Sequence, residues 1–148
     1  MPNNDGTHLL RGMTLNVTNR CNLGCRYCYV PQCDNQQHMS QEVAESAIDL
    51  LLRHHHGPKV TVSFFGGEPF LVPDLIERVT DGTKKRAPGD VRVKFGATTN
   101  GTLLEGDILE ICRKEAFQLA LSIDGTMTSS DRRTLVDDAD STNLVLQR

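Results

Sequence analysis

The sequence of 148 residues lacks a long hydrophobic run, and this lack argues against a membrane-spanning helix. Its first six residues, Met-Pro-Asn-Asn-Asp-Gly, contain neither the basic start nor the apolar stretch of a secretory signal. We therefore expect the chain to stay in the cytoplasm, where cysteine thiols are kept reduced.

The sequence also lacks an excess of one charge, because 16 lysines and arginines face 19 aspartates and glutamates. Acids and bases alternate rather than form blocks, which gives no electrostatic reason to expect nucleic acid or a membrane surface as a partner. Internal repeats beyond alternating strand and helix patterns are absent, and so are low-complexity tracts. With 38% apolar and 24% charged residues, the composition is typical of one soluble globular domain.

Cysteine is the residue type that points to chemistry. The chain has five cysteines, an odd number that makes a poor disulfide framework, and Cys21, Cys25 and Cys28 share one short segment. Three thiolates at this C-x3-C-x2-C spacing can bind three irons of a [4Fe-4S] cube and leave the fourth iron open to a substrate. A closed structural site needs four ligands, so the number of cysteines favours a catalytic cluster.

Other potential metal ligands allow a second interpretation. Cys33 extends the pattern to C-x3-C-x2-C-x4-C, and four thiolates would form a structural zinc or iron site in a non-catalytic metal-binding module. Cys112 is expected to be a small buried residue of a helix. The histidines at 54–56 end a predicted helix, where positive charge interacts favourably with the helix dipole, so we expect no metal site there.

Short β-type runs alternate with helical patterns, which is typical of βα units and a parallel sheet. The predicted strands cover residues 13–17, 60–65, 91–98 and 118–123. The predicted helices cover residues 40–55, 73–85 and 105–116, and a further helix begins near Asn143. The sequence therefore predicts an α/β fold with about four βα units.

A polar or glycine-rich motif follows each of the last three predicted strands. These motifs are Gly66-Gly67-Glu68-Pro69, Thr99-Asn100-Gly101-Thr102 and Leu121-Ser122-Ile123-Asp124-Gly125. Each is also compatible with ordinary turn and cap chemistry. Ligands of parallel α/β folds gather at the carboxyl ends of strands, so we expect the motifs and the cysteine segment to form one site.

The cysteine segment and the three motifs, in this order, resemble the radical S-adenosylmethionine (SAM) enzymes. The similarity extends from about Leu15 to about Gly125 and is strongest to the N-terminal part of the core domain of anaerobic sulfatase-maturating and peptide-modifying (SPASM-type) enzymes. It implies that Cys21, Cys25 and Cys28 ligate a [4Fe-4S] cluster and that SAM chelates its unique iron. Reductive cleavage of SAM would then give methionine and a 5′-deoxyadenosyl radical that abstracts hydrogen from a substrate.

The same resemblance implies which residues bind SAM. It places Tyr27 near the adenine of SAM. At the methionine group of SAM it places a turn, which consists of Gly66, Gly67, Glu68 and Pro69. Asn100, Ser122 and Asp124 would complete the site at the last two strand ends. The implied partners are SAM, a peptide or protein substrate, and an electron donor such as flavodoxin or ferredoxin.

Chain length sets the expected extent of the barrel. A radical SAM core has about six βα units, and about 30 residues per unit would place between four and five units in 148 residues. We therefore expect a partial (βα)6 TIM-like barrel, truncated at its C-terminus, in a single incomplete core domain over residues 1–148. Its cluster loop would cover residues 18–39, its strand–helix units would end near residue 125, and residues 126–148 would be a polar tail. A second polypeptide or self-association would complete the barrel of this enzyme or enzyme fragment.

Overall fold

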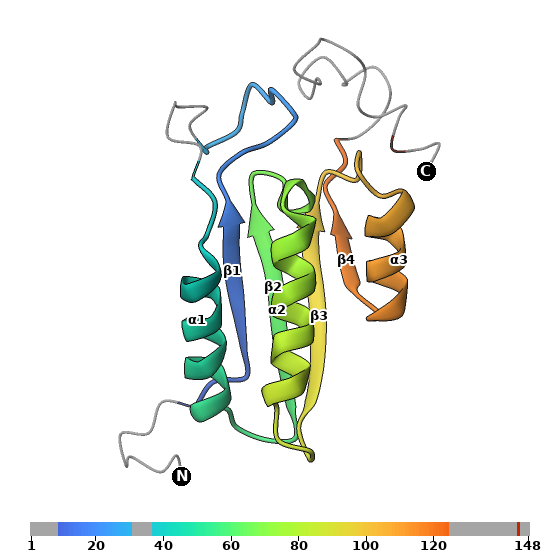
Figure 1. The fold of residues 1–148 in the computed structure, drawn as a ribbon. Helices are drawn as coiled ribbons and strands as arrows, with labels where there is room; N and C mark the ends of the chain where they lie inside the picture. The colour runs from blue at the N-terminus through green and yellow to red at the C-terminus, as the bar shows by residue number, and fades with distance from the viewer. Residues whose placement is uncertain (1–8, 31–36, 125–144, 146–148) are drawn as a thin grey trace.

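The residues that the structure describes form one four-stranded parallel sheet. The computed structural model describes residues 9–30 and 37–124, together with Val145. The strands lie in the order β1 (Gly12–Thr18), β2 (Lys59–Gly66), β3 (Arg92–Thr99) and β4 (Gln118–Leu121). All three strand pairs are parallel, and the four arrows in Figure 1 point the same way. The α/β fold with a parallel sheet is therefore confirmed.

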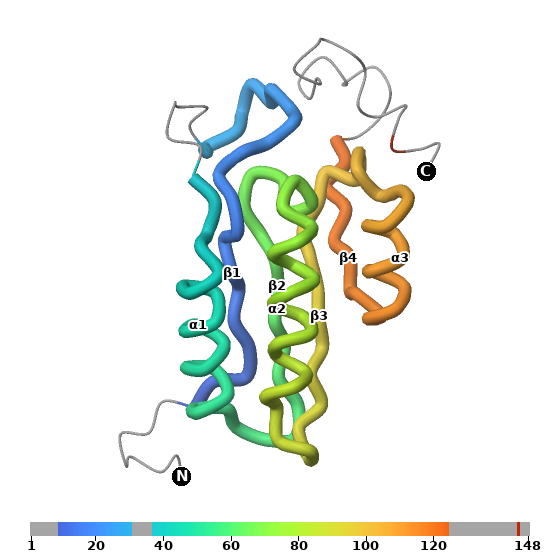
Figure 2. The backbone as a smooth tube through the Cα atoms, viewed as in Figure 1, coloured from blue at the N-terminus to red at the C-terminus, as the bar shows by residue number. Residues whose placement is uncertain are grey.

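Helices connect successive strands and cover one face of the sheet. They are α1 (Gln41–Arg53), α2 (Pro73–Arg86) and α3 (Gly106–Lys114), and a short 3-10 helix, η1 (Pro69–Leu71), precedes α2. Figure 2 shows the backbone returning through each helix to the start of the next strand. No helix within the described ranges has the length and apolarity needed to cross a membrane.

The core lies between the sheet and its helices. Alternate strand residues point to the helical face, as the period of two in a β-strand requires, and they meet the apolar faces of α1 and α2. The fully or almost fully buried members include Leu15, Val17, Val60, Val62, Phe64, Phe95, Ile48, Leu51, Ile76 and Val79. Cys112 on α3 is 5% exposed and belongs to this core, which confirms the prediction for that residue.

Predicted and observed elements differ at their ends. Helix α1 begins after Ser40, whose hydroxyl accepts a hydrogen bond of 3.3 Å from the Val43 amide. Strand β4 ends at Leu121, two residues before the predicted end, and η1 was not predicted at all. The predicted helix near Asn143, most of the tail and Cys33 lie outside the described residues.

Candidate functional site

The cysteine loop leaves the carboxyl end of β1 and returns to the same place. Thr18 and His38 form an antiparallel bridge, and the Met39 amide donates a hydrogen bond of 2.8 Å to the Val17 carbonyl. The His38 Nδ1 and Thr18 Oγ1 atoms are also 2.8 Å apart. Figure 1 shows the first half of the loop beyond the arrowheads of the strands. The base of the loop is therefore closed at the sheet edge where ligands of parallel folds bind.

Gly66 and Gly67 allow the end of β2 to pack against the chain that precedes Cys21. The Gly67 amide donates a hydrogen bond of 2.8 Å to the Thr18 carbonyl. A Cβ atom at Gly66, where φ is 144°, would lie 2.1 Å from the Thr18 carbonyl oxygen, and one at Gly67 would lie 2.2 Å from that of Arg20. Both glycines are thus needed for close backbone approach.

Glu68 connects the turn after β2 to the turn after β3. Its side chain is fully buried, and Oε1 accepts hydrogen bonds from the Phe70 amide at 3.1 Å and the Thr99 hydroxyl at 2.8 Å. Its Oε2 accepts a hydrogen bond of 2.8 Å from the Asn100 amide. These bonds hold two strand ends together, and the expected place of Glu68 near SAM stays a prediction.

Asn100 joins the end of β3 to the cysteine loop. Its side-chain Nδ2 donates a hydrogen bond of 2.8 Å to Oδ1 of Asn22 and lies 3.8 Å from the Cys21 sulfur. Thr102 completes this cluster by bonding to both asparagines. Sequence reasoning missed Asn22 and Thr102, and the only sequence signal for them was their position within the recognised motifs.

The end of β4 contacts the loop through Tyr27 and Asp124. The Tyr27 hydroxyl donates a hydrogen bond to the Asp124 carboxylate, although the tyrosine is 56% exposed. The Ser122 amide donates a hydrogen bond of 2.9 Å to the Thr99 carbonyl. No hydrogen bond of the Ser122 hydroxyl is found among the residues that the structure describes.

The three cysteines share the loop but are not gathered as ligands of a metal. Cys21 and Cys25 are half-buried, and Cys28 is exposed. Burial raises the pKa of the Cys21 thiol above its ordinary value, and a hydrogen bond from the Leu23 amide opposes this rise. In residues 9–30 and 37–124, no three cysteine, histidine, aspartate or glutamate side chains form a group that could hold a metal ion.

The donor set nevertheless fits an iron–sulfur cluster in its chemistry. Cys21, Cys25 and Cys28 each carry a thiol, and thiolate is the ligand type that such clusters require. A half-buried thiol with a raised pKa is expected to stay protonated until a cation displaces its proton. Cys33 lies outside the described residues, so the structure does not place a fourth thiol.

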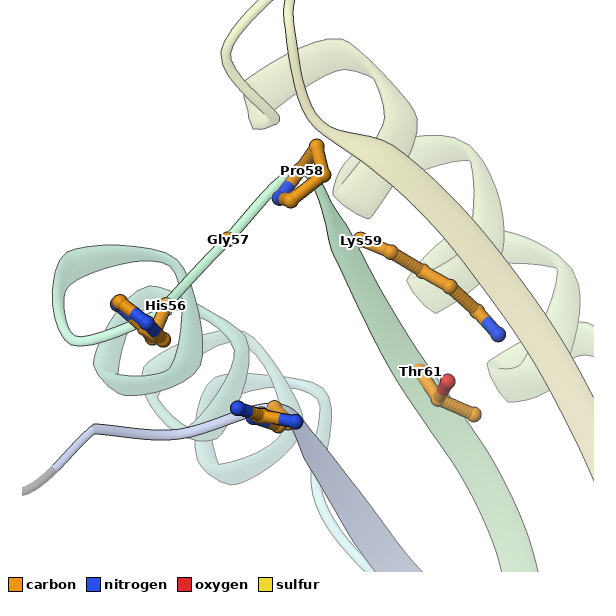
Figure 3. Close-up of a pocket in the computed structure, with 6 residues that line it drawn as sticks. His56, Gly57, Pro58, Lys59 and Thr61 are labelled. Carbon is orange, nitrogen blue, oxygen red and sulfur yellow. The ribbon is translucent and has the colours of Figure 1, made fainter.

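A cavity of about 460 Å³ lies at the opposite edge of the sheet, where the strands begin. Its lining consists of Arg11, His56, Gly57, Pro58, Lys59 and Thr61, and Figure 3 shows the Lys59 side chain extending along the sheet. None of the predicted site residues lines this cavity. His55 interacts within its own helix end, where its Nδ1 atom lies 2.7 Å from the Leu52 carbonyl oxygen. The histidine cluster is thus separate from the cysteine loop.

Comparison with known proteins identifies the family. The family model of the radical SAM superfamily matches residues 15–137, which include the end of β1, the cysteine loop and strands β2 to β4. The chain belongs to the radical SAM superfamily. The resemblance that the four motifs indicated is thereby confirmed.

Relatives of this radical SAM chain include a protein of unknown function and a maturase. The chain is 34% identical over 116 residues to the uncharacterised protein MJ0907 of Methanocaldococcus jannaschii, covering 78% of this chain and 39% of the relative. It is 32% identical over 118 residues to a serine-type anaerobic sulfatase-maturating enzyme of Bacteroides thetaiotaomicron, covering 75% of this chain and 28% of the enzyme.

Solved structures of anSMEcpe share the fold of this radical SAM chain. Native anSMEcpe with bound AdoMet aligns with a TM-score of 0.81 and 25% identity, covering 93% of this chain and 40% of that chain. The same protein with bound AdoMet and Kp18Cys peptide also gives a TM-score of 0.81 and 25% identity, covering 94% and 38%. The radical SAM chain therefore spans between about a quarter and two fifths of the length of these proteins.

Proposed function

We propose that this chain binds a [4Fe-4S] cluster through Cys21, Cys25 and Cys28 and binds SAM at the carboxyl ends of β2, β3 and β4. The observation that carries the proposal is that the cysteine loop contacts all three of these strand ends. When bound, the cluster and SAM would supply one-electron cleavage of the sulfonium, giving methionine and a 5′-deoxyadenosyl radical for hydrogen abstraction. Membership of the radical SAM superfamily supports this chemistry.

The carboxyl ends of β2, β3 and β4 would each bind a different part of SAM. The turn of Gly66, Gly67 and Pro69 would present its main chain to the methionine group, while the buried Glu68 carboxylate keeps that turn in place. At β4, the hydroxyl of Ser122 would donate a hydrogen bond to a polar group of SAM or accept one from it.

Tyr27 would contribute an aromatic surface beside the adenine. Its ring is more than half exposed, whereas its hydroxyl is bonded to Asp124, so the ring orientation is set from the end of β4. Asn100, at the end of β3, would bind SAM close to the cluster, because its side-chain amide reaches the sulfur of Cys21.

The proposed substrate is a peptide or protein. Support comes from the anaerobic sulfatase-maturating relatives and from the similarity to anSMEcpe with bound AdoMet and Kp18Cys peptide. We further propose a cytoplasmic location and a flavodoxin or ferredoxin as electron donor, because cluster reduction needs a low-potential reductant in a reducing compartment. The outer edge of β4 is unpaired within the described sheet, and a second polypeptide or self-association would extend the barrel there.

Measurement of 5′-deoxyadenosine tests the proposed function. The chain would be purified without oxygen, supplied with iron and sulfide, reduced with dithionite and mixed with SAM, and the nucleoside would be quantified by mass spectrometry. We expect product from the unmodified chain and none from Cys25→Ala. Cys112→Ala is the matched control, because this cysteine lies in the core and outside the loop, and we expect it to keep the activity.

Two outcomes contradict the proposal. Iron binding without 5′-deoxyadenosine would indicate the non-catalytic metal-binding module. Equal activity in Cys25→Ala and the unmodified chain would show that the cysteine loop does not hold the catalytic cluster.

A further inference from the structure

We propose that Asn22, Asn100 and Thr102 form a positioning ring that holds Cys21 against a hydrogen-bond donor for its sulfur. This inference rests on the proposed function, because it concerns the first of the three cluster cysteines. It assigns a role to Asn22 and Thr102, and it gives Asn100 a task at the sulfur in addition to any contact with SAM.

The ring is a closed cycle of side-chain hydrogen bonds between segments that are about 80 residues apart. Asn22 Nδ2 donates to Thr102 Oγ1 at 2.8 Å, and Thr102 Oγ1 donates to Asn100 Oδ1 at 2.7 Å. Asn100 Nδ2 closes the cycle by donating to Asn22 Oδ1 at 2.8 Å. Asn100 and Thr102 are 6% and 3% exposed, so breaking the cycle would leave buried polar groups without partners.

The cycle determines which way the Asn100 amide faces. Its Oδ1 accepts two hydrogen bonds from Thr102, one from the hydroxyl and one of 2.9 Å from the main-chain amide. A flipped Asn100 would place its NH2 group against the main-chain N–H of Thr102, with two donors facing each other. Nδ2 therefore points to the loop, where one hydrogen is directed at Asn22 and the other at the Cys21 sulfur, 3.8 Å away.

Glu68 connects the ring to the turn after β2. The buried Glu68 carboxylate accepts hydrogen bonds from the Asn100 main-chain amide and from the Thr99 hydroxyl, at 2.8 Å each. The position of the ring is thus set by the end of β2 as well as by β3. Asn100 and Thr102 are thus fixed at the end of β3, and the ring holds the cysteine loop through the side chain of Asn22.

The contact with Cys21 has a consequence for a bound cluster. Hydrogen bonds to ligand sulfurs are among the features that set the reduction potential of iron–sulfur proteins. A donor near sulfur stabilises the additional negative charge of the reduced form and raises the potential. Loss of the ring would therefore release the loop at Cys21 and lower the reduction potential.

Thr102→Val tests the ring without altering Asn22, Asn100 or Cys21. It keeps the shape of the side chain and removes only the hydroxyl, and Thr102→Ser restores that hydroxyl. Asn19→Ala is the matched control, because Asn19 is an exposed asparagine of the same loop outside the ring. Circular dichroism would verify folding of each variant, and Asn22→Ala would serve as the second ring variant.

The first readout uses the protein without metal. Alkylation of Cys21 and Cys28 by iodoacetamide would be followed by peptide mass spectrometry, with the exposed Cys28 as internal reference. We expect Cys21 to react roughly 3 to 10 times faster in Thr102→Val and Asn22→Ala. The loss of about one net hydrogen bond would release the loop and make the half-buried Cys21 thiol more accessible by about this factor. Thr102→Ser and Asn19→Ala should match the unmodified chain.

The second readout is the midpoint potential of the reconstituted cluster, measured by redox titration with electron paramagnetic resonance. We expect a lower potential in Thr102→Val and Asn22→Ala and an unchanged one in Thr102→Ser. Folded ring variants with unchanged Cys21 alkylation would overturn the inference. If the unmodified chain assembles no cluster, the proposed function fails, whereas the alkylation rates still decide whether the ring positions Cys21.

Discussion

Glu68→Gln is the substitution whose effect can be worked out most fully. The carboxylate accepts three hydrogen bonds in a fully buried position. Glutamine can keep its oxygen toward the Phe70 amide and the Thr99 hydroxyl, but its NH2 group then faces the Asn100 amide, which lies 2.8 Å from Oε2. Two buried donors would face each other in place of one hydrogen bond.

The expected loss of stability follows from the contact between these two donors. Leaving a buried donor unsatisfied reduces the free energy of unfolding by about 1–3 kcal/mol. For a chain of this size, such a loss lowers the melting temperature by roughly 3–10 °C. Relaxation of the turn would bring the value toward the lower end of this range.

Urea unfolding of the metal-free protein, followed by circular dichroism, measures the change. Glu45→Gln is the control, because Glu45 lies on the exposed face of α1 and should change stability by less than about 0.5 kcal/mol. Equal midpoints for Glu68→Gln and the unmodified chain would refute the structural role of this carboxylate. Weaker SAM binding with unchanged stability would instead support direct contact between Glu68 and SAM.

Three further predictions concern backbone approach, a buried thiol and the fourth loop cysteine. Gly66→Ala should reduce the free energy of unfolding by at least about 2 kcal/mol, because its Cβ would lie 2.1 Å from the Thr18 carbonyl oxygen at a positive φ. Gly89→Ala, which meets nothing within 4 Å, should have little effect, and equal losses in urea unfolding would contradict this reasoning.

Burial raises the pKa of Cys112 from 9.0 to about 11, so its thiol ionises first in the unfolded chain. Stability should therefore fall by about 1–2 kcal/mol as the pH rises from 9 to 11, and Cys112→Ala should lack this component. An identical alkaline decline in both proteins would exclude Cys112 as its source. Cys33→Ala should retain iron and sulfide after reconstitution, whereas loss of metal would favour a four-thiolate site.

Local patterns in the sequence were sufficient to predict the four strands and the three α-helices of the described residues. The period of two in residues 60–65 and the helical spacing in residues 40–55 reflect burial on one side, which each segment shows without reference to the others. Element ends were less predictable, because they depend on hydrogen bonds with neighbouring elements that local patterns do not contain. The 3-10 helix η1 depends on a cap from Glu68 that no periodicity reveals.

The sequence also predicted that the four motifs come together, since the carboxyl ends of parallel strands lie on the same side of the sheet. Their residue roles were harder to infer, because a motif shows which residues are present but not which partners they find. For Glu68, the motif gave no sign of its hydrogen bonds with Phe70, Thr99 and Asn100, and its expected place near SAM stays a prediction. Asn22 attracted no attention in the sequence, and its partners lie 78 and 80 residues away.

By itself, the sequence determined the fold class, the family and the edge of the sheet where the cysteine loop lies. These properties depend on local periodicity and on ordered motifs, both of which can be read along the chain. Only the tertiary structure decided that Gly67 meets Arg20, that Tyr27 meets Asp124 and that Asn22 joins Asn100. Such contacts arise because folding brings distant segments within hydrogen-bond reach, and their geometry depends on the register of the whole sheet.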